Sequence, residues 1–377
     1  MAGTTERFHP GRVIMGAFAL AIVIGSALLA LPAATESGAG ASVLDAMFTA
    51  TSAVCVTGLV TVDTGTYWST FGEAVILGLI QLGGLGIMTV ASLMVVLLSR
   101  RMGLRARLVA QAQTRTVTVR DVGRVVRNVI LFSLASEAVV AAILVARFAA
   151  THQMPFGAAL WDGIFHSVSA FNNAGFSLNA DSLVRYIDDP YILLTICTAV
   201  ILGGLGFPVV FELVRAWRHP RSWSVTTKIT VSVTSILLLV GTIAIAAAER
   251  HNLATLGGMS HDSRLLAAFF TATMPRTAGF NAIDIGMMSS EGLLFTDLLM
   301  FIGGGSASTA GGIKVTTVGL LAVVLWAEMR GESRVNVGVR QVPADNQRQA
   351  LAVAVLFGTL SAAATFALLT ITDFSFE

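Results

Sequence analysis

The chain has 377 residues, of which 55% are hydrophobic and only 12% charged, and its net charge at pH 7 is +2. Soluble domains carry about 25% charged residues, so this composition excludes an ordinary water-soluble globular protein and favours a chain that folds in a lipid bilayer. A helix needs about 20 apolar residues to cross a bilayer, and stretches of that length recur through the chain.

Basic residues are concentrated in four segments that separate the apolar stretches. These segments are Arg7 to Arg12, the eight arginines of 100–127, Arg215 to Lys228, and Arg330 to Arg348. Because cytoplasmic loops carry an excess of Lys and Arg, we expect the N-terminus and these three later segments in the cytoplasm, in a multi-pass protein of the cytoplasmic (inner) membrane. Nothing else in the sequence supports nucleic-acid binding.

The first repeat, residues 1–99, is predicted to contain a membrane span, a short helix, a small-residue turn and a second span. These parts are expected at 13–34, at 42–54, at Val56-Thr57-Gly58 and at 71–99. The short helix, SVLDAMFTATSAV, is too brief to cross a bilayer and runs directly into the turn.

The second repeat, residues 128–216, follows a basic cytoplasmic linker at 100–127 and has the same four parts. They are predicted as a span at 128–149, a short helix at 158–171, the turn Asn173-Ala174-Gly175 and a span at 190–214. The order of the parts therefore repeats with a different sequence.

The third repeat, residues 217–327, has the same order and is followed by a second cytoplasmic linker at 328–348. Its parts are predicted as a span at 226–248, a short helix at 263–274, the turn Thr277-Ala278-Gly279 and a long span at 293–326. Each repeat also has a glycine cluster in its second span, which begins at Gly83, Gly203 and Gly303. The clusters follow the turn glycines after 25, 28 and 24 residues, an agreement that indicates internal repetition.

A fourth repeat begins at 349–377 with another apolar span, at 349–372, and no further turn follows it. We therefore expect the fourth repeat to be incomplete in this chain. We also expect the 1–377 chain by itself not to support selective ion uptake, because a missing quarter leaves unpaired carbonyls open to lipid.

The glycine turns have the chemistry of an ion-selective filter. Irregular backbone is tolerated at membrane depth only where it is buried in protein or lines a water-filled path, and backbone carbonyls can replace the hydration shell of K⁺. Glycine accepts the positive φ that lets successive carbonyls face one axis. The negative end of each preceding short helix favours a cation, and three such turns indicate one cation path.

Several stretches resemble the Trk/Ktr/HKT superfamily of potassium transporters. They are Ser169-Ala170-Phe171-Asn172-Asn173-Ala174-Gly175-Phe176-Ser177, Pro275-Arg276-Thr277-Ala278-Gly279-Phe280-Asn281, Gln81-Leu82-Gly83-Gly84-Leu85-Gly86 and Gly311-Gly312-Ile313-Lys314. The short N-terminus is most similar to that of the Ktr-type membrane subunits, since Trk-type members carry extra helices there.

The resemblance implies an all-α integral membrane protein with M1–pore helix–M2 units in pseudo-four-fold symmetry around one pore. It implies a K⁺ filter at nine residues: Val56, Thr57, Gly58, Asn173, Ala174, Gly175, Thr277, Ala278 and Gly279. It further implies a homodimer and a cytosolic nucleotide-binding regulatory ring of the KtrA/TrkA type. The ions expected are K⁺ and, where transport is coupled, Na⁺, with no covalent or catalytic cofactor and no bound metal beyond the transported ion.

The third glycine cluster predicts a broken helix with a flexible loop at 303–314, since each glycine costs about 1 kcal/mol in a helix relative to alanine. Lys314 follows it, and an ionisable group at membrane depth is a functional candidate. One interpretation is a helix kink with a snorkelling lysine. The other, supported by the resemblance, is an intramembrane gate formed by Gly303, Gly304, Gly305, Ser306, Ser308, Thr309, Gly311, Gly312 and Lys314.

Three glutamates, Glu73, Glu137 and Glu212, are predicted within or near spans. We expect Glu137, the deepest, to pair with a neighbouring helix, with direct ion contact as the alternative. His166 is expected to make a packing hydrogen bond behind the second turn.

Two other classes of function compete with the ion pore. A secondary transporter of another cation or small solute is the alternative, but inverted repeats are its usual signature and these repeats all begin on the same side. An enzyme is not indicated, since the six histidines show no metal-ligand spacing and no nucleophile elbow occurs.

Overall fold

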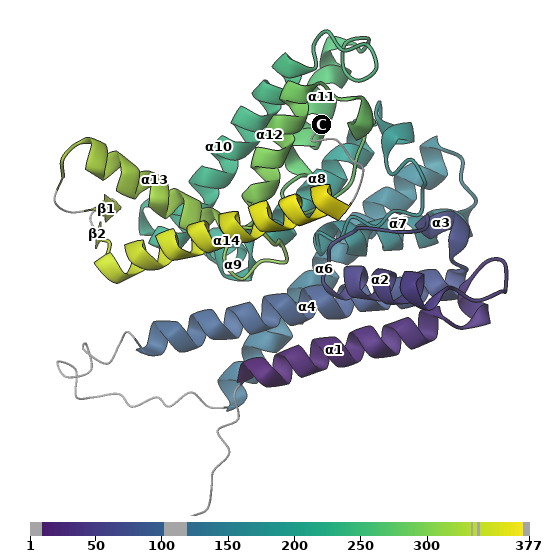
Figure 1. Cartoon of the computed structure of the whole chain (residues 1–377), viewed down its shortest axis with the longest axis horizontal. Coiled ribbons are helices and arrows are strands. Elements are labelled where there is room, and N and C mark those ends of the chain that lie inside the picture. Colours follow the sequence, from purple (N-terminus) through teal and green to yellow (C-terminus); the bar gives the residue numbers. More distant parts are fainter. Residues whose placement is uncertain (1–9, 102–118, 333–334, 338–339, 372–377) are drawn as a thin grey trace, which may run out of the picture.

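The computed structural model describes residues 10–101, 119–332, 335–337 and 340–371. Within these ranges the regular secondary structure is helical apart from one antiparallel hairpin, in which β1 (Asn336–Val337) pairs with β2 (Arg340–Gln341). The repeats follow one another across the molecule in Figure 1, from α1 in purple to α12 in green, and α14 in yellow packs against α13. The predicted all-α membrane fold is confirmed.

The first repeat consists of α1 (Pro10–Leu29), α2 (Val43–Val54), α3 (Thr64–Tyr67) and α4 (Thr70–Arg101). α1 ends before the predicted limit of 34 because Leu31, which precedes a proline, is extended (φ −67°, ψ 144°). The Ser42 hydroxyl then caps α2 by accepting a hydrogen bond from the Asp45 N–H at 3.1 Å. α1 packs against both α2 and α4, so the short helix is enclosed by the two spans.

The second repeat consists of α6 (Val119–Thr151), α7 (Phe156–Phe171), α8 (Pro190–Leu205) and α9 (Phe207–Ala216). The prediction of one continuous span at 190–214 is wrong, because α8 and α9 meet at an angle of 103°. Gly206 lies at the corner with φ 89° and ψ 141°, a conformation open to glycine, and Pro208 cannot continue the hydrogen bonding of α8. α6 begins at Val119, inside the segment predicted as linker, and residues 102–118 of that linker lie outside the described residues.

The third repeat consists of α10 (Val225–Ala248), α11 (His261–Thr273), α12 (Ser290–Phe301) and α13 (Val315–Met329). The predicted break in its last span is confirmed, since residues 302–314 are not helical. α14 (Ala344–Ile371) follows the hairpin, and its most apolar window contains no buried residue. Short 3-10 helices join these elements: η1 (Pro32–Ala34), η2 (Val184–Tyr186), η3 (Pro220–Ser222) and η4 (Ile285–Met287).

The core lies around the short helices α2, α7 and α11, and the longer helices surround it. Ala50, Phe165 and Phe270 are fully buried at these helices. The outer faces carry large apolar side chains in the open, including Leu20 and Leu239. Four described helices are long and apolar enough to cross a bilayer, or five if the bent pair α8–α9 is counted as one broken span. Apolar side chains in the core and on the outer faces together fit lipid as the solvent.

Candidate functional site

The turns after α2, α7 and α11 share one backbone conformation. Val56, Asn173 and Thr277 have φ of 56°, 58° and 74°. Two residues later, Gly58, Gly175 and Gly279 have φ of 80°, 75° and 77°. Positive φ at a β-branched residue is strained and persists only where the surroundings impose it. Positive φ at the first and third residues therefore recurs in all three predicted filter turns.

The N–H groups of the turns point back to the helices that precede them. Thr57 N–H donates to Ser52 O at 2.8 Å, Ala174 N–H to Ser169 O at 2.8 Å, and Gly279 N–H to Met274 O at 3.1 Å. Among the hydrogen bonds of the described residues, none is accepted by the carbonyl oxygens of the nine predicted filter positions. Free carbonyl oxygens at the negative ends of three helices can coordinate a cation.

The three turns lie against one another through their glycines. A Cβ atom placed on Gly58 would overlap the carbonyl oxygen of Ala174. A Cβ on Gly175 would lie 2.6 Å from Ala278 O and 3.1 Å from the Cα of Gly279. The structure therefore brings the nine predicted filter residues together, and it needs glycine at these positions for close contact as well as for positive φ.

The glycine clusters of the second spans let other backbone segments approach closely. A Cβ on Gly83 would overlap Val54 O at the end of α2, and one on Gly203 would overlap Phe171 O at the end of α7. In the third repeat a Cβ on Gly303 would overlap Gly311 O, within the same loop. The clusters thus seat the filter turns in the first two repeats and fold the loop 302–314 in the third.

The loop 302–314, called the intramembrane loop below, is a buried and hydrogen-bonded segment. Gly303 N–H donates to Ile313 O at 3.0 Å, which closes the loop at its base. Gly305 N–H donates to Gly204 O at 2.7 Å, so the loop also rests on the corner between α8 and α9. The broken helix was predicted correctly, and these backbone bonds hold the loop that interrupts it.

Three contacts join the intramembrane loop to the filter turns. Asn173 Nδ2 donates to Thr309 Oγ1 at 2.7 Å, and Gly311 N–H donates to Thr277 Oγ1 at 3.1 Å. Arg276 Nη2 donates to Gly303 O at 3.2 Å. The predicted filter and the predicted gate are therefore in direct contact, at the second and third turns.

Lys314 and Arg276 are the basic residues of this region. Lys314 precedes α13, and its Nζ donates to Ala310 O at 2.5 Å, across the base of the loop. Arg276 is 7% exposed, and its Nε has no partner among the described residues. Arg276 was not predicted as a site residue, although its position directly before a filter turn was a signal for it.

The predicted acidic residues and His166 lie near the turns or at helix ends and contact protein groups. Glu137 accepts hydrogen bonds from Gln81 and Asn172, so the expected pairing with a neighbouring helix is confirmed. Glu73 accepts from Trp161 Nε1 at 2.6 Å, and Glu212 accepts from Ser224 Oγ at 2.7 Å. His166 is fully buried behind the second turn.

The His166 ring contacts Asp162 through Nδ1 and Ser177 Oγ through Nε2, the latter at 2.9 Å. Its predicted role as a packing hydrogen bond is confirmed. In the part of the chain that the structure describes, no group of three or more His, Cys, Asp and Glu side chains could hold a metal ion.

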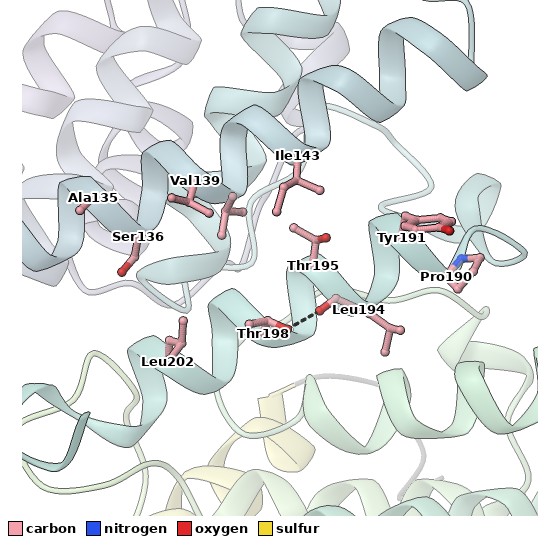
Figure 2. Close-up of a pocket in the computed structure, with 11 residues that line it drawn as sticks. Ala135, Ser136, Val139, Ile143, Pro190, Tyr191, Leu194, Thr195, Thr198 and Leu202 are labelled. Carbon is pink, nitrogen blue, oxygen red and sulfur yellow. Dashed lines mark hydrogen bonds between the residues drawn. The ribbon is translucent and has the colours of Figure 1, made fainter. Parts of the chain in front are cut away.

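A separate groove of about 740 Å³ lies between α6 and α8 (Figure 2). Thr195 of α8 lies opposite Ile143 of α6 across it, and the Thr198 hydroxyl donates to the carbonyl of Leu194 at 2.7 Å. The lining carries no charged side chain. This groove does not suit a cation and is not part of the candidate site.

The TrkH family model, described as a cation transport protein, matches residues 4–372. The chain belongs to the TrkH family. It is 42% identical over 349 residues to Ktr system potassium uptake protein B of Bacillus subtilis, an alignment that covers 93% of this chain and 77% of that protein.

Other relatives agree with membership of the TrkH family. The chain is 37% identical to Ktr system potassium uptake protein B of Vibrio alginolyticus, over 97% of this chain and 80% of that protein. It is 35% identical to the potassium/sodium uptake protein NtpJ of Enterococcus hirae, over 94% of this chain and 78% of that protein. The crystal structure of the potassium transporter TrkH from Vibrio parahaemolyticus matches with a TM-score of 0.70 at 21% identity, covering 98% of this chain and 73% of that one, which shows a shared fold.

Proposed function

We propose that this TrkH-family chain forms the pore of a potassium uptake system in the cytoplasmic membrane. The observation that carries the proposal is the set of three glycine turns, in which the carbonyl oxygens accept no hydrogen bond from the described residues. Such oxygens can replace the hydration shell of K⁺. The names of the relatives, two potassium uptake proteins and one potassium/sodium uptake protein, support K⁺ as the cargo and make Na⁺ the candidate coupling ion.

In this proposal the filter consists of three matching segments. They are Val56 to Gly58, Asn173 to Gly175, and Thr277 to Gly279. All three segments have positive φ at their first and third residues. Gly58 also lies close to Ala174, and Gly175 lies close to Ala278, which supports a single ion path between the segments.

The intramembrane loop is the proposed gate of this path. Its contacts with Asn173 and Thr277 support this role, because a loop that touches two filter turns lies beside the route of the ion. Movement of the loop requires the breaking of these bonds and of the Gly305–Gly204 backbone bond, so the closed arrangement is stabilised by identifiable contacts. A purely structural kink is the alternative.

The proposed assembly is a homodimer with a cytosolic nucleotide-binding ring of the KtrA/TrkA type. The word "system" in the names of two relatives supports a multi-component assembly. The proposed topology has the N-terminus in the cytoplasm, supported by the basic segments at 100–127 and 330–348.

The experiment is growth and K⁺ uptake in bacteria that lack their own potassium uptake, with the full-length protein expressed. The unaltered protein should restore growth at low K⁺, and Gly175→Ala should lower uptake on the order of tenfold, because alanine at φ 75° is strained by about 1–2 kcal/mol and its Cβ meets Ala278. Gly78→Ala is the matched control, since nothing lies within 4 Å of a Cβ there. Uptake of another cation or solute, with no K⁺ uptake, would instead favour the secondary transporter.

A further inference from the structure

A buried hydrogen-bonded cluster, called the Glu137 cluster below, lies directly behind the second filter turn. It joins Gln81 of α4, Glu137 of α6 and Asn172, the residue that caps the C-terminus of α7. Gln81 Nε2 donates to both carboxylate oxygens of Glu137, at 3.1 and 3.0 Å. Asn172 Nδ2 lies 3.2 Å from Glu137 Oε1 and 3.0 Å from Gln81 Oε1. Asn172 immediately precedes the filter residue Asn173, so the cluster borders the ion path.

The Glu137 cluster breaks the internal repetition. Two positions before the glycine cluster, Gln81 corresponds to Ile201 and Phe301 in the other repeats. One position before the filter, Asn172 corresponds to Cys55 and Arg276. The other two repeats form the same turn without this cluster, so the backbone conformation does not require it. A buried polar cluster that the fold does not need points to a role in function.

The donors around Glu137 are neutral, although the side chain is only 5% exposed. Both carboxylate oxygens accept hydrogen bonds from Gln81 Nε2. In the described part of the chain, no ion pair includes Glu137. A buried carboxylate is costly unless a positive charge compensates it. A cation bound at the second filter turn, next to Asn172, would supply that charge.

We infer that Glu137 is the counter-charge of the transported cation at the second filter turn, acting as a positioning residue through Asn172. The inference rests on the proposed function, since it needs a cation in the filter. The charge behind the filter then differs between the described repeats. The Glu137 carboxylate lies behind the second turn, and the Arg276 guanidinium lies behind the third. The second turn is then the side that holds the cation most strongly.

The test is the concentration dependence of K⁺ uptake by the full-length protein and two variants with opposite defects. Glu137→Gln keeps the shape and removes the charge, whereas Glu137→Asp keeps the charge and shortens the reach. At an effective dielectric constant of about 20, two unit charges roughly 10 Å apart interact by about 1.7 kcal/mol, which changes affinity on the order of tenfold. We expect Glu137→Gln to raise the KM for K⁺ by about that factor with little change in maximal rate, and Glu137→Asp to stay closer to the unaltered protein.

Glu73→Gln is the matched control, because Glu73 is a second buried glutamate, 8% exposed and bound to Trp161, in a different environment. Its KM for K⁺ should not change. An unchanged KM for Glu137→Gln, or a larger defect in Glu137→Asp than in Glu137→Gln, overturns the inference, since either result assigns Glu137 to packing alone. Absence of K⁺ uptake by the unaltered protein overturns the proposed function itself, so the two failures are distinguishable.

Discussion

The hydrogen bond between Thr309 and Asn173 is the contact at which the gate can be tested with the smallest change. Thr309 Oγ1 accepts from Asn173 Nδ2 at 2.7 Å and donates to Phe171 O at 3.3 Å. Valine has nearly the same shape without the hydroxyl, so Thr309→Val removes both bonds. Asn173 Nδ2 is then left with the carbonyl of Phe171 at 3.5 Å, in a residue that is 1% exposed.

The cost of this change can be worked out from the bonds. One hydrogen bond contributes about 0.5–1.5 kcal/mol net, and a buried donor without a good partner costs about 1–3 kcal/mol. A loss of roughly 2 kcal/mol in the closed arrangement raises the population of the displaced loop by about thirtyfold. The backbone hydrogen bond from Gly305 to Gly204 remains in the variant, so the loop stays partly held in place.

The assay is K⁺ flux through the purified full-length protein in liposomes without any cytosolic partner. Thr309→Val should increase this flux markedly, and Thr309→Ser, which keeps the hydroxyl, should stay near the unaltered protein. Thr296→Val is the matched control, because among the described residues the buried Thr296 hydroxyl bonds only to Gly292 O of its own helix. A folded Thr309→Val protein with unchanged flux and unchanged dependence on the partner would refute the gate and leave a structural kink.

Three further predictions concern the surroundings of the site. Gly206→Ala should lower the melting temperature and membrane yield, since φ of Gly206 is 89° and a Cβ there would overlap Ser306 O. Gly204→Ala should be tolerated, because the nearest atom to a Cβ at Gly204 is Asn173 Oδ1 at 4.0 Å. Arg276→Gln should raise partner-independent flux severalfold by loss of the bond to Gly303 O, which reconstituted liposomes measure. Burial raises the pKa of Asp189, but hydrogen bonds from Arg147 and His152 outweigh this effect, and the net pKa lies below the ordinary value of 3.8. The ionised Asp189 therefore stabilises the fold above that pH, and this stabilisation is lost as pH falls through the lowered pKa. Thermal unfolding of Asp189→Asn should be less sensitive to pH below about 4 than that of the unaltered protein.

The sequence predicted the helices and turns well where one feature decided the local structure. The spacing of glycines located the three turns that follow α2, α7 and α11, and five glycines near Ser308 were enough to predict the break between α12 and α13. These features are local, since glycine destabilises helices and accepts positive φ without help from distant residues.

The features that sequence reasoning missed depend on contacts between repeats. Positive φ at Val56 and Thr277 is imposed by packing, and neither residue type predicts it. The corner at Gly206 depends on the intramembrane loop from the next repeat, because Ser306 O occupies the space where a Cβ would lie. The hydrogen bond from Arg276 to Gly303 O likewise joins residues that are 27 positions apart, and no local sequence pattern predicts this partner.

The filter is tested most directly by locating the ion. Anomalous diffraction from crystals of the full-length protein grown with Tl⁺, a K⁺ analogue, gives the position of the bound cation without reference to transport rates. The account predicts a peak between the three turns, within coordination distance of the carbonyl oxygens of residues 56–58, 173–175 and 277–279, and displaced by excess K⁺. Strong peaks elsewhere, with none at these carbonyls, would contradict the assignment of the filter.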